Sequence, residues 1–297
     1  MKKLIKNNPK IQISDGQGFR LNKLKTNERL HYKDEASLKK ELDLHKEKIS
    51  TLQEKLYAND SHSVLIVLQA IDAAGKDSCI KHVLSGVNPQ GCHVVNFKQP
   101  SKEELDHDFI WRTYKQLPER GKIGVFNRSY YEEVLVCKVH PEYVIGQNIP
   151  GIEDIKQLDK KFWENRYRAI NEMERHLVKN GTVIIKVFLH LSKDEQKNRF
   201  LERIDNPKKQ WKFSFADLKE RALWDKYQDA YTDMIRETSS KHAPWYIVPA
   251  DDQWVSRAIV GRLLLEHLED LNLSYPEISQ DDRLSLAEAR KLLLNEK

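Results

Sequence analysis

Residues 65–78 read LIVLQAIDAAGKDS, and this stretch decides the fold. Its first half is almost wholly apolar, which is typical of a strand covered on both faces. Gly75 and Lys76 follow, as in the phosphate-binding loop of the form G-x-x-x-x-G-K-[ST]. Two positions depart from that form, because Ala70 replaces the first glycine and Asp77 replaces the serine or threonine that would hold magnesium. The stretch therefore predicts a strand and a phosphate loop, and it raises the question of which residue holds the metal.

Apolar strands alternate with helical segments on both sides of this loop. The expected strands are SVLIVLQA (63–70), CHVVNF (92–97), KIGVFN (122–127), TVIIKVFLHL (182–191) and WYIVPA (245–250). The expected helices cover residues 36–57, 76–84, 102–116, 130–138, 154–179, 193–204, 215–238 and 253–270. Several helix starts have the S-x-x-E/D form of a capping box, namely Ser101/Glu104, Ser129/Glu132, Ser192/Glu195 and Ser214/Asp217. Strands that alternate with helices predict an α/β fold with a parallel sheet and helices on both faces.

The composition indicates a large packed core beneath a heavily charged surface. With 297 residues, 32% of them charged, and a mean hydropathy of -0.69, we expect a single domain over residues 1–297. Residues 1–35 lack periodicity and predict an irregular arm, while the tail 276–297 contains LSLAEARKLLL, which predicts a final packed helix. No apolar run approaches the roughly 20 residues that cross a membrane, and we expect no secretory signal. Three cysteines without metal-like spacing indicate free thiols, so we expect a cytoplasmic protein.

The loop at residues 71–77 is placed for anion binding. In an α/β fold, backbone N–H groups and the helix dipole converge on an anion between a buried strand and its helix. Gly75 allows the backbone to approach closely, and Lys76 adds a positive charge. A chance AGK in a turn is the alternative, but the position after the first buried strand favours phosphate binding. Mg²⁺ prefers oxygen ligands, so we expect Asp72 to hold it, with Asp77 as a competitor that could instead favour the helix N-terminus.

The strand expected at 122–127 delivers a second group of polar side chains, in the sequence VFNRSYYEEVL. The carboxyl end of a parallel strand faces the active crevice, and here it carries Asn127 and Arg128. Many phosphate-loop enzymes have an aspartate at such a strand end as a second metal ligand. Asn127 is neutral, so Glu132 and Glu133 could compensate, although a capping box could occupy Glu132. We expect Arg128 to contact phosphate rather than to be a surface cation.

Residues 197–212 read KNRFLERIDNPKKQWK and are strongly basic, with six Lys/Arg against two acidic residues. Arg199 and Arg203 are four apart and therefore share a helix face. Pro207 follows Asn206 and ends that helix, and three lysines come after it, Lys208, Lys209 and Lys212. A charge run is usually a solvated surface, but nucleoside-phosphate kinases carry an arginine-bearing lid after the corresponding strand. We therefore predict a lid over about residues 197–213.

Five motifs in this order resemble the polyphosphate kinase 2 family: DAAGKDS, FKQPSKEELDHDFIWR, FNRSYYEEVLV, RFLERIDNPKKQWKFS and PWYIVPADD. The resemblance covers most of residues 20–272, and the single catalytic unit is unlike the tandem-domain members. The motif FNRSYYEEVL, with Asn where other members have Asp, is similar to the class III members, which phosphorylate nucleoside mono- and diphosphates. The resemblance implies a thymidylate-kinase-like, three-layer α/β/α P-loop kinase fold with a parallel central sheet and a helical lid.

The resemblance also implies a magnesium-dependent transfer between inorganic polyphosphate and nucleotides. The residues expected in catalysis are Asp72, Lys76, Arg128, Arg199 and Arg203, with Asp72 on the metal. Those expected to bind phosphate or polyphosphate are Ala73, Ala74, Gly75, Lys76, Lys81, Lys208, Lys209 and Lys212, and those expected to bind nucleotide are Asn127, Arg128 and Glu133. The expected cofactor is Mg²⁺, with Mn²⁺ as a substitute. The expected partners are polyphosphate and nucleotides, without nucleic acid or membrane, and the expected assembly is a homo-oligomer, a dimer or a tetramer.

The expected function is reversible transfer of the terminal phosphoryl of polyphosphate to AMP and/or ADP. One alternative, an ATP-dependent nucleoside monophosphate kinase, would share the loop and the lid but would not use polyphosphate. A more distant alternative is a non-enzymatic polyanion or nucleic-acid binder, which would interleave aromatic with basic residues and would not need Asp72. Trp111 and Trp211 adjoin basic motifs, and we interpret both as packed side chains.

Overall fold

A six-stranded sheet runs through the middle of the molecule. The computed structural model describes residues 5–30, 32 and 34–296. The strands are β1 (Gln12–Ile13), β2 (Ser63–Ala70), β3 (Cys92–Asn96), β4 (Ile123–Asn127), β5 (Thr182–His190) and β6 (Trp245–Pro249). Their order is β1-β6-β5-β2-β4-β3. All neighbouring pairs from β6 to β3 are parallel, and only β1 pairs antiparallel, with β6. The phosphate-loop strand β2 therefore lies in the interior of the sheet, between β4 and β5.

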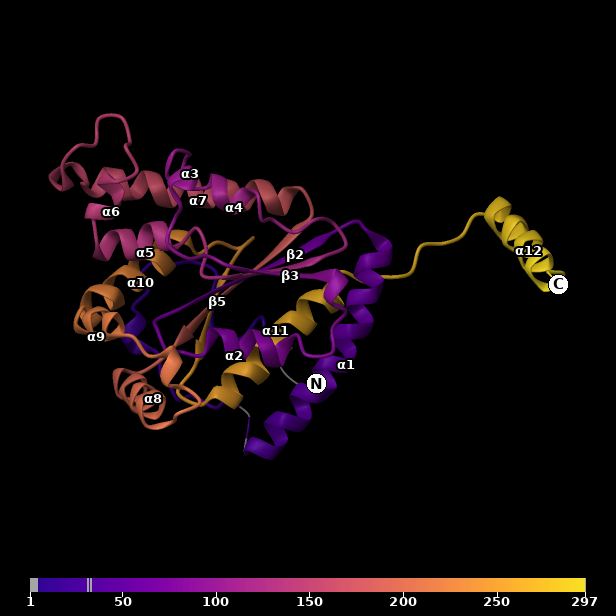
Figure 1. Cartoon of the computed structure of the whole chain (residues 1–297), viewed down its shortest axis with the longest axis horizontal. Helices are drawn as coiled ribbons and strands as arrows, with labels where there is room; N and C mark the ends of the chain where they lie inside the picture. Colours follow the sequence, from indigo (N-terminus) through magenta and orange to yellow (C-terminus); the bar gives the residue numbers. More distant parts are fainter. Residues whose placement is uncertain (1–4, 31, 33, 297) are drawn as a thin grey trace.

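Helices cover both faces of the sheet and make three layers (Figure 1). On one face lie α1 (Glu35–Asn59), α2 (Lys76–Val83) and α11 (Gln253–Asp270), and α11 packs against the other two. On the opposite face lie α5 (Glu132–Val139), α7 (Lys160–Lys179) and α10 (Trp224–Thr238), and α10 packs against the other two. Because both faces are covered, every residue of β2 is buried. The α/β fold class and the five long strands are confirmed.

Several helix boundaries differ from those expected. The helix expected over 102–116 is two short helices, α3 (Lys102–Leu105) and α4 (Trp111–Tyr114), because the carboxylate of Asp108 bonds the Ile110 N–H and makes a local turn. The helix expected over 215–238 is interrupted at Leu223 between α9 (Phe215–Ala222) and α10. The start of α7 is at Lys160 rather than 154, since Asp159 caps it through the Phe162 N–H. A further short helix, α6 (Glu142–Ile145), was not predicted.

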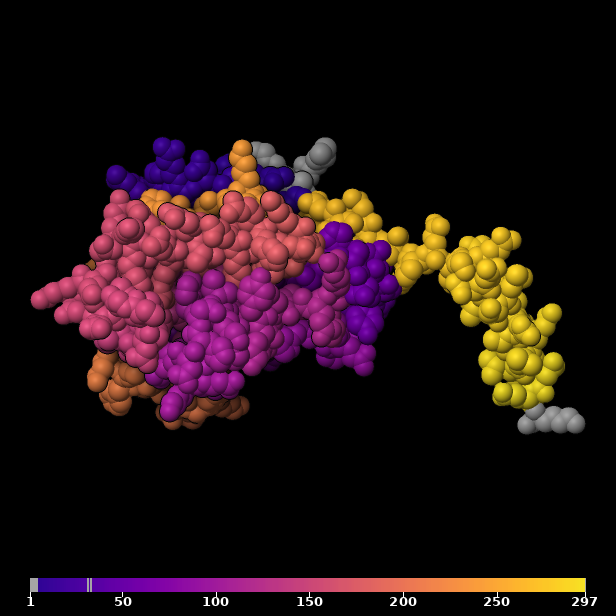
Figure 2. Space-filling view, turned by 90° about the horizontal axis from the view of Figure 1, so that it is seen from above, coloured from indigo at the N-terminus to yellow at the C-terminus, as the bar shows by residue number. Residues whose placement is uncertain are grey.

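The two ends of the chain also depart from expectation. The arm expected to be irregular contains β1, which adds an antiparallel strand to the sheet through Gln12 and Ile13. Its later part reaches the β6 end, where Thr26 Oγ1 donates to Asp251 at 2.6 Å. The tail forms a helix, α12 (Gln280–Leu294), but the prediction that it packs is wrong, because all its residues are exposed and it stands apart from the body (Figures 1 and 2). The parts of both predictions that fall on residues 1–4, 31, 33 and 297 lie outside the described residues.

The carboxyl ends of the parallel strands meet at one edge of the sheet, and this edge carries the candidate site. The N-terminus of α2 faces it, as do α8 (Lys193–Asp205), the turn Gln210–Lys212 and α9. Within the part of the chain that the structure describes, none of the helices combines the length and apolar character needed to cross a membrane.

Candidate active site

The loop between β2 and α2 has the backbone of an anion-binding site. Ala73 and Gly75 both lie in the left-handed region, with φ of 64° and 99°. Gly75 precedes α2 without capping it by a side chain, so the N–H groups of the first helical turn remain available to a ligand. Alternation of left- and right-handed residues turns successive N–H groups into one hollow. The loop can therefore bind phosphate although Ala70 replaces the first glycine.

Lys76 is buried beside this loop, with 9% of its surface exposed. Its ammonium donates to the carbonyl oxygens of Ala70 at 2.8 Å and Ile71 at 3.4 Å. Burial lowers the pKa of Lys76, and the nearby carboxylate of Asp72 partly opposes that shift. The two carbonyl groups hold the ammonium at the wall of the cavity, where a phosphate oxygen could replace them.

Asp77 and Asn127 form a pair across the site. The Asn127 amide donates to Asp77 Oδ1 at 2.6 Å, and the side-chain oxygen of Asn127 is buried without a hydrogen-bond partner. Asp77 belongs to the first turn of α2, whereas Asn127 ends β4. An unsatisfied buried oxygen beside a carboxylate is a ready acceptor for a cation.

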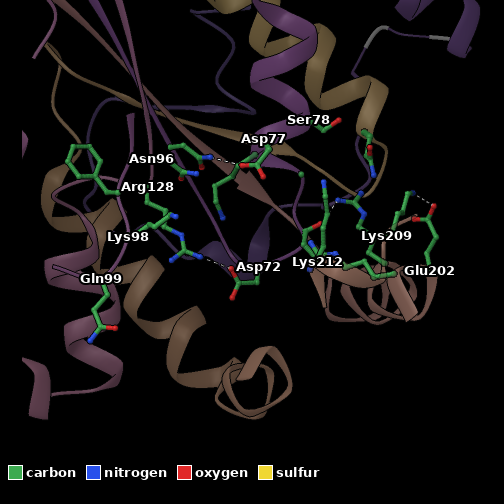
Figure 3. A pocket seen from close by; sticks show the side chains of 18 residues that line it. Asp72, Asp77, Ser78, Asn96, Lys98, Gln99, Arg128, Glu202, Lys209 and Lys212 are labelled. Atoms are coloured by element: carbon green, nitrogen blue, oxygen red, sulfur yellow. Dashed lines mark hydrogen bonds and ion pairs between the residues drawn. The ribbon is translucent and has the colours of Figure 1, made fainter. Parts of the chain in front are cut away.

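Arg128 follows Asn127 and turns its guanidinium into the site. It adopts a left-handed backbone, with φ of 63°, and donates to the Asp72 carboxylate at 3.1 Å. Both side chains are only partly buried, so their charges remain accessible to a ligand. The sequence-expected Asp72 and Arg128 are thus brought together at the edge of the phosphate loop (Figure 3).

The capping box expected between Ser129 and Glu132 does not form. The Ser129 hydroxyl accepts instead from the Tyr131 N–H at 3.1 Å and from the Gln69 amide at 3.0 Å. The surrounding protein raises the pKa of Glu132 by desolvation, against the opposing charges of Arg128 and Lys76. Glu132 therefore adds a carboxylate next to these cations. The Ser101/Glu104 box forms in full, whereas Ser192 and Ser214 cap their helices without the reciprocal bond to their own N–H.

A cavity of about 510 Å³ contains most of these groups. Its lining has seven cationic side chains against three carboxylates, which suits a polyanion. Figure 3 shows Lys98 and Arg128 on one side, Lys209 and Lys212 on the lid side, and Asp72 between them. The full lining is Asp72, Ala73, Gly75, Lys76, Asp77, Ser78, Asn96, Phe97, Lys98, Gln99, Asn127, Arg128, Arg199, Glu202, Arg203, Lys209, Lys212 and Gln253.

The cations of residues 197–213, the segment expected to be a lid, differ in their distance from the cavity. Lys209 pairs with Glu202 at the cavity, whereas Lys208 is exposed and outside the lining. Arg203 lies 3.5 Å from Asp217 of α9. Burial raises the pKa of Asp217, and the negative charge of Asp72 adds to this shift. Lys209 and Arg203 both line the cavity in which a phosphate chain would lie.

Arg199 is bound to protein groups through all three of its guanidinium nitrogens. Its side chain is 6% exposed and lines the base of the cavity. The contacts of Arg199 therefore differ from those of Arg203, since Arg199 donates to backbone carbonyl groups and to Glu195 of its own helix.

A second cavity of about 390 Å³ adjoins the first. The two cavities share Phe97, Lys98, Gln99 and Arg128. The second has apolar walls, Leu105, Val136 and Tyr143 among them, together with a few charged side chains, which is the usual lining of a small-molecule site.

Glu133 lines this second cavity but is already engaged. Its carboxylate accepts from Arg166 at 3.1 Å and from the Gln147 amide at 2.7 Å, and its side chain is 7% exposed. Arg166 in turn lies against the rings of Phe109 and Phe162. Glu133 therefore shapes the wall of the cavity, while Glu132 is the carboxylate next to the cations.

The expected site residues differ in their position relative to the two cavities. Ala74, Lys81 and Lys208 line neither cavity, and Glu133 lines the second one. The other expected residues all line the first cavity, namely Asp72, Ala73, Gly75, Lys76, Asn127, Arg128, Arg199, Arg203, Lys209 and Lys212. Trp211 is 79% exposed, so its interpretation as packed is wrong; Trp111 is half-buried and stacks on His107.

Sequence reasoning missed the contribution of β3. Asn96, Lys98 and Gln99 line the first cavity from the end of that strand. Arg112 is 7% exposed, lies over the Phe97 ring and donates to the Lys98 carbonyl at 3.0 Å, which fixes this segment. The sequence did contain a signal for this contribution. Polar residues stand at the end of β3, in NFKQP, just as they stand at the end of β4, in NRS.

The residues present fit a magnesium ion. Within the described ranges, no group of three or more histidine, cysteine or acidic side chains could hold a metal by itself. Mg²⁺ does not need one, because it keeps several waters and usually takes one or two carboxylates plus substrate phosphates. Asp72 and Asp77 line the same cavity, and the unpartnered oxygen of Asn127 lies beside them. Either carboxylate could bind the ion together with a phosphate at Lys76.

A central parallel sheet, a phosphate loop with its lysine, and a basic segment that lines the same cavity define a P-loop phosphotransferase. The family model described as polyphosphate kinase 2 matches residues 32–276. The chain belongs to the polyphosphate kinase 2 family.

Relatives and a solved structure agree with this membership. The chain is 51% identical to the ADP-polyphosphate phosphotransferase of Rhodopseudomonas palustris over 96% of this chain and 97% of the relative. It is 47% identical to the AMP/ADP-polyphosphate phosphotransferase of Meiothermus ruber over 77% of this chain and 80% of the relative. The crystal structure of polyphosphate kinase 2 from Arthrobacter aurescens TC1 superposes with a TM-score of 0.87 at 38% identity, covering 99% of this chain and 98% of the other.

Proposed function

We propose that the protein transfers the terminal phosphoryl group of inorganic polyphosphate to AMP and/or ADP, reversibly. The observation that carries this proposal is the junction of the two cavities at Lys98, Gln99 and Arg128. The basic cavity suits a phosphate chain, and the apolar one suits a nucleoside. A phosphoryl group at the junction is reachable from both sides.

The phosphate chain lies along the basic cavity, with its terminal phosphoryl at the loop and Lys76. Arg128 and Arg203 face this region and offset the charge of the transferring group. The acceptor phosphate enters from the second cavity past Lys98 and Arg128. Phosphoryl transfer asks the protein mainly for positioning and charge neutralisation, so no nucleophilic side chain is needed.

We propose Mg²⁺ as the cofactor, with Mn²⁺ as a substitute. Asp72 is the ligand expected from the sequence, and the Asp77–Asn127 pair is a second group of oxygen atoms on the same cavity. When bound, the ion would neutralise phosphate charge and orient the transferring group. Asp72 also holds Arg128, so it orders a phosphate-binding cation whether or not it binds the metal.

The relatives' names support polyphosphate as the donor, and the lining of the donor cavity agrees. Among the described residues, Phe97 is the one aromatic side chain of this lining, whereas the cations come from four separate segments of the chain. An ATP-dependent nucleoside monophosphate kinase needs a base-binding wall on the donor side as well. The charge distribution therefore favours a chain of phosphates over ATP in this position.

The test is an assay of purified protein with polyphosphate, Mg²⁺ and either AMP or ADP, with the nucleotide products resolved by chromatography. Formation of ADP or ATP supports the proposal. Activity with ATP plus AMP and none with polyphosphate would instead identify the nucleotide kinase. Absence of any product in both mixtures would exclude both enzymes and leave the polyanion binder.

We propose a cytoplasmic location for the enzyme. Cys79, Cys92 and Cys137 are all free thiols, and this supports a reducing compartment, the cytoplasm. We propose a homo-oligomer, a dimer or a tetramer, without nucleic acid or membrane partners. Light scattering of the purified protein measures the assembly directly.

A further inference from the structure

Two side chains of helix α8, Gln196 and Arg199, donate hydrogen bonds to carbonyl groups of the phosphate loop. The Gln196 amide donates to the Asp72 carbonyl at 3.0 Å. One terminal nitrogen of Arg199 donates to the carbonyls of Ala73 at 3.1 Å and Ala74 at 2.9 Å. Three consecutive carbonyl groups of the loop therefore point toward α8.

The same arginine joins the loop to a second strand end. Its other terminal nitrogen donates to the carbonyls of Ala250 at 2.6 Å and Asp251 at 3.1 Å, just after β6. Its Nε donates to Glu195 at 2.9 Å. The planar guanidinium presents its N–H groups in a fixed fork, so it can bridge two loops in a way that a lysine cannot.

Gln196 is itself held in place. It is 1% exposed, and its side-chain oxygen accepts from Arg221 of α9 at 2.8 Å. Arg221 also donates to the Lys193 carbonyl at 2.7 Å. The orientation of the Gln196 amide is thereby defined, with its NH₂ group toward the loop.

The position of the carbonyl groups determines where the N–H groups point. In a planar trans peptide, the C=O of one residue and the N–H of the next point in opposite directions. Holding the carbonyls of Asp72 and Ala74 toward α8 directs the N–H groups of Ala73 and Gly75 the other way. Ala73 and Gly75 line the cavity, whereas the Ala74 N–H is unavailable to a ligand because it donates to the Ile71 carbonyl.

We infer that Gln196 and Arg199 are positioning residues that keep the phosphate loop in its anion-binding conformation. They act through the N–H groups of Ala73 and Gly75, and Arg199 does not need to touch the transferred phosphoryl. The first turns of α8 are then a fixed support for the loop, and Arg203 is the arginine of this helix that faces the substrate. This inference rests on the proposed use of polyphosphate by the loop.

The test compares Arg199→Lys with Arg203→Lys, the same change one turn further along the same helix. Binding of tripolyphosphate and of long-chain polyphosphate is measured by calorimetry without nucleotide, together with amide hydrogen exchange at residues 72–76 and steady-state kinetics. Arg199→Lys should raise the Kd for both ligands by about 10-fold or more, because several hydrogen bonds are lost. The factor should be the same for both chain lengths, since the loop binds only the chain end. Exchange at residues 72–76 should become faster, and KM should rise more than kcat falls.

Arg203→Lys should leave exchange in the loop unchanged. If Arg199→Lys lowers kcat with Kd and exchange unchanged, Arg199 acts only on the transition state and the inference is wrong. If Arg199→Lys does not fold, Gln196→Met tests the inference in its place, because it removes one hydrogen-bond donor at similar side-chain volume. Gln196→Met should raise the Kd by about 2- to 10-fold and speed amide exchange at residues 72–76. An unaltered Kd in a folded Gln196→Met would overturn the inference. Wild-type protein that fails to bind tripolyphosphate would overturn the proposed function instead.

Discussion

The side-chain amide of Asn127 donates a 2.6 Å hydrogen bond to the carboxylate of Asp77. In the usual P-loop, a serine or threonine follows the lysine and an aspartate ends the neighbouring strand. Here the carboxylate follows the lysine and the neutral group ends β4. The pair therefore carries one negative charge, as the usual pair does, but the charge sits on the helix rather than on the strand.

This exchange predicts a metal phenotype for Asp77→Asn. Two amides cannot supply the carboxylate that Mg²⁺ prefers, so the concentration of Mg²⁺ at half-maximal rate should rise by about 10-fold or more. Titration of the rate with Mg²⁺, and of Mn²⁺ binding by electron paramagnetic resonance, measures the effect. Glu202→Gln is the matched control, because Glu202 lines the same cavity but pairs with Lys209. An unchanged metal requirement would leave Asp77 as a partner of Asn127 only.

Lys76→Ala should abolish most of the activity and leave the fold intact. Removing one charged donor from a transferring group usually costs about 10²–10³ in kcat. The free energy of unfolding should not fall, since burial already disfavours the charge of Lys76, as its lowered pKa indicates. Single-turnover kinetics and urea unfolding of the same preparation check the two statements. Near-normal turnover would show that the loop binds phosphate through its backbone alone.

Glu132 should produce an acidic limb in the pH–rate profile. Its pKa is raised above the ordinary value of 4.5, chiefly by desolvation, so it remains protonated to a higher pH than a free glutamate. The ionised form attracts Arg128 and Lys76, so kcat/KM should rise as the pH passes through the raised pKa. Glu132→Gln should lack this limb. An identical limb in wild type and variant would assign it to another group.

The raised pKa of Glu132 also affects stability, and ionisation lowers stability where it raises activity. A carboxyl with a raised folded pKa favours the folded state only while it is protonated, below its unfolded pKa of about 4.5. This contribution is lost as the pH rises through the folded pKa. Glu132→Gln should therefore gain stability relative to wild type at pH 7 and not at pH 4, as urea unfolding at both pH values measures.

The lid lysines should divide by their position. Lys209 and Lys212 line the cavity, whereas Lys208 is exposed outside it. Replacing Lys209 or Lys212 by alanine should weaken polyphosphate binding and reduce the slope of log Kd against log salt by about 1 each, by analogy with phosphate contacts in nucleic acids. Lys208→Ala is the internal control and should change neither quantity. Equal effects of all three would mean that the lid acts through its net charge.

Glu133→Ala should destabilise the fold more than it alters chemistry. The change leaves Arg166, which is 5% exposed on its side chain, without its carboxylate partner. An uncompensated buried charge costs about 3–5 kcal/mol of unfolding free energy. The double variant Glu133→Ala/Arg166→Leu should recover part of this loss. Undiminished stability, with a changed preference between AMP and ADP, would return Glu133 to the nucleotide-binding role expected from the sequence.

Local patterns were sufficient to predict most of the framework. The strands are apolar runs, and the phosphate loop follows from residues that are close in the chain. Errors arose both where a distant residue competes with a local one and where a local turn interrupts a helical pattern. Ser129 bonds Gln69, which removes it from the capping box with Glu132, and Asp108 makes a turn in place of a helix. The hydrogen bonds of Arg199 could likewise not be predicted from the sequence. They join carbonyl groups that follow β2 to carbonyl groups that follow β6, and these segments are far apart in the chain.

The pairing of Asn127 with Asp77 depends on sheet register in the same way. Asn127 stands beside Leu68 of β2, and this neighbour relation places it next to the first turn of α2. Neither residue carries a local signal for the other, because they are brought together only when β2 and β4 align. Many residues that line the first cavity could therefore be named from the sequence, whereas their partners in space required the fold.

The interior place of β2 determines when this enzyme acquires its site during synthesis. Leu65 pairs with Gly124 on one side and with Ile184 on the other, so both neighbours of the loop strand arrive late in the chain. Domains with such long-range pairings fold slowly, and they expose strand edges until the pairings close. A nascent chain that has left the ribosome only as far as β4 already carries the whole loop sequence. It still lacks β5, α8 and β6, and hence Arg199 and the carbonyl groups that this arginine joins to the loop. Phosphate binding by the nascent chain is therefore expected to begin only after residues 250–251 have emerged and docked.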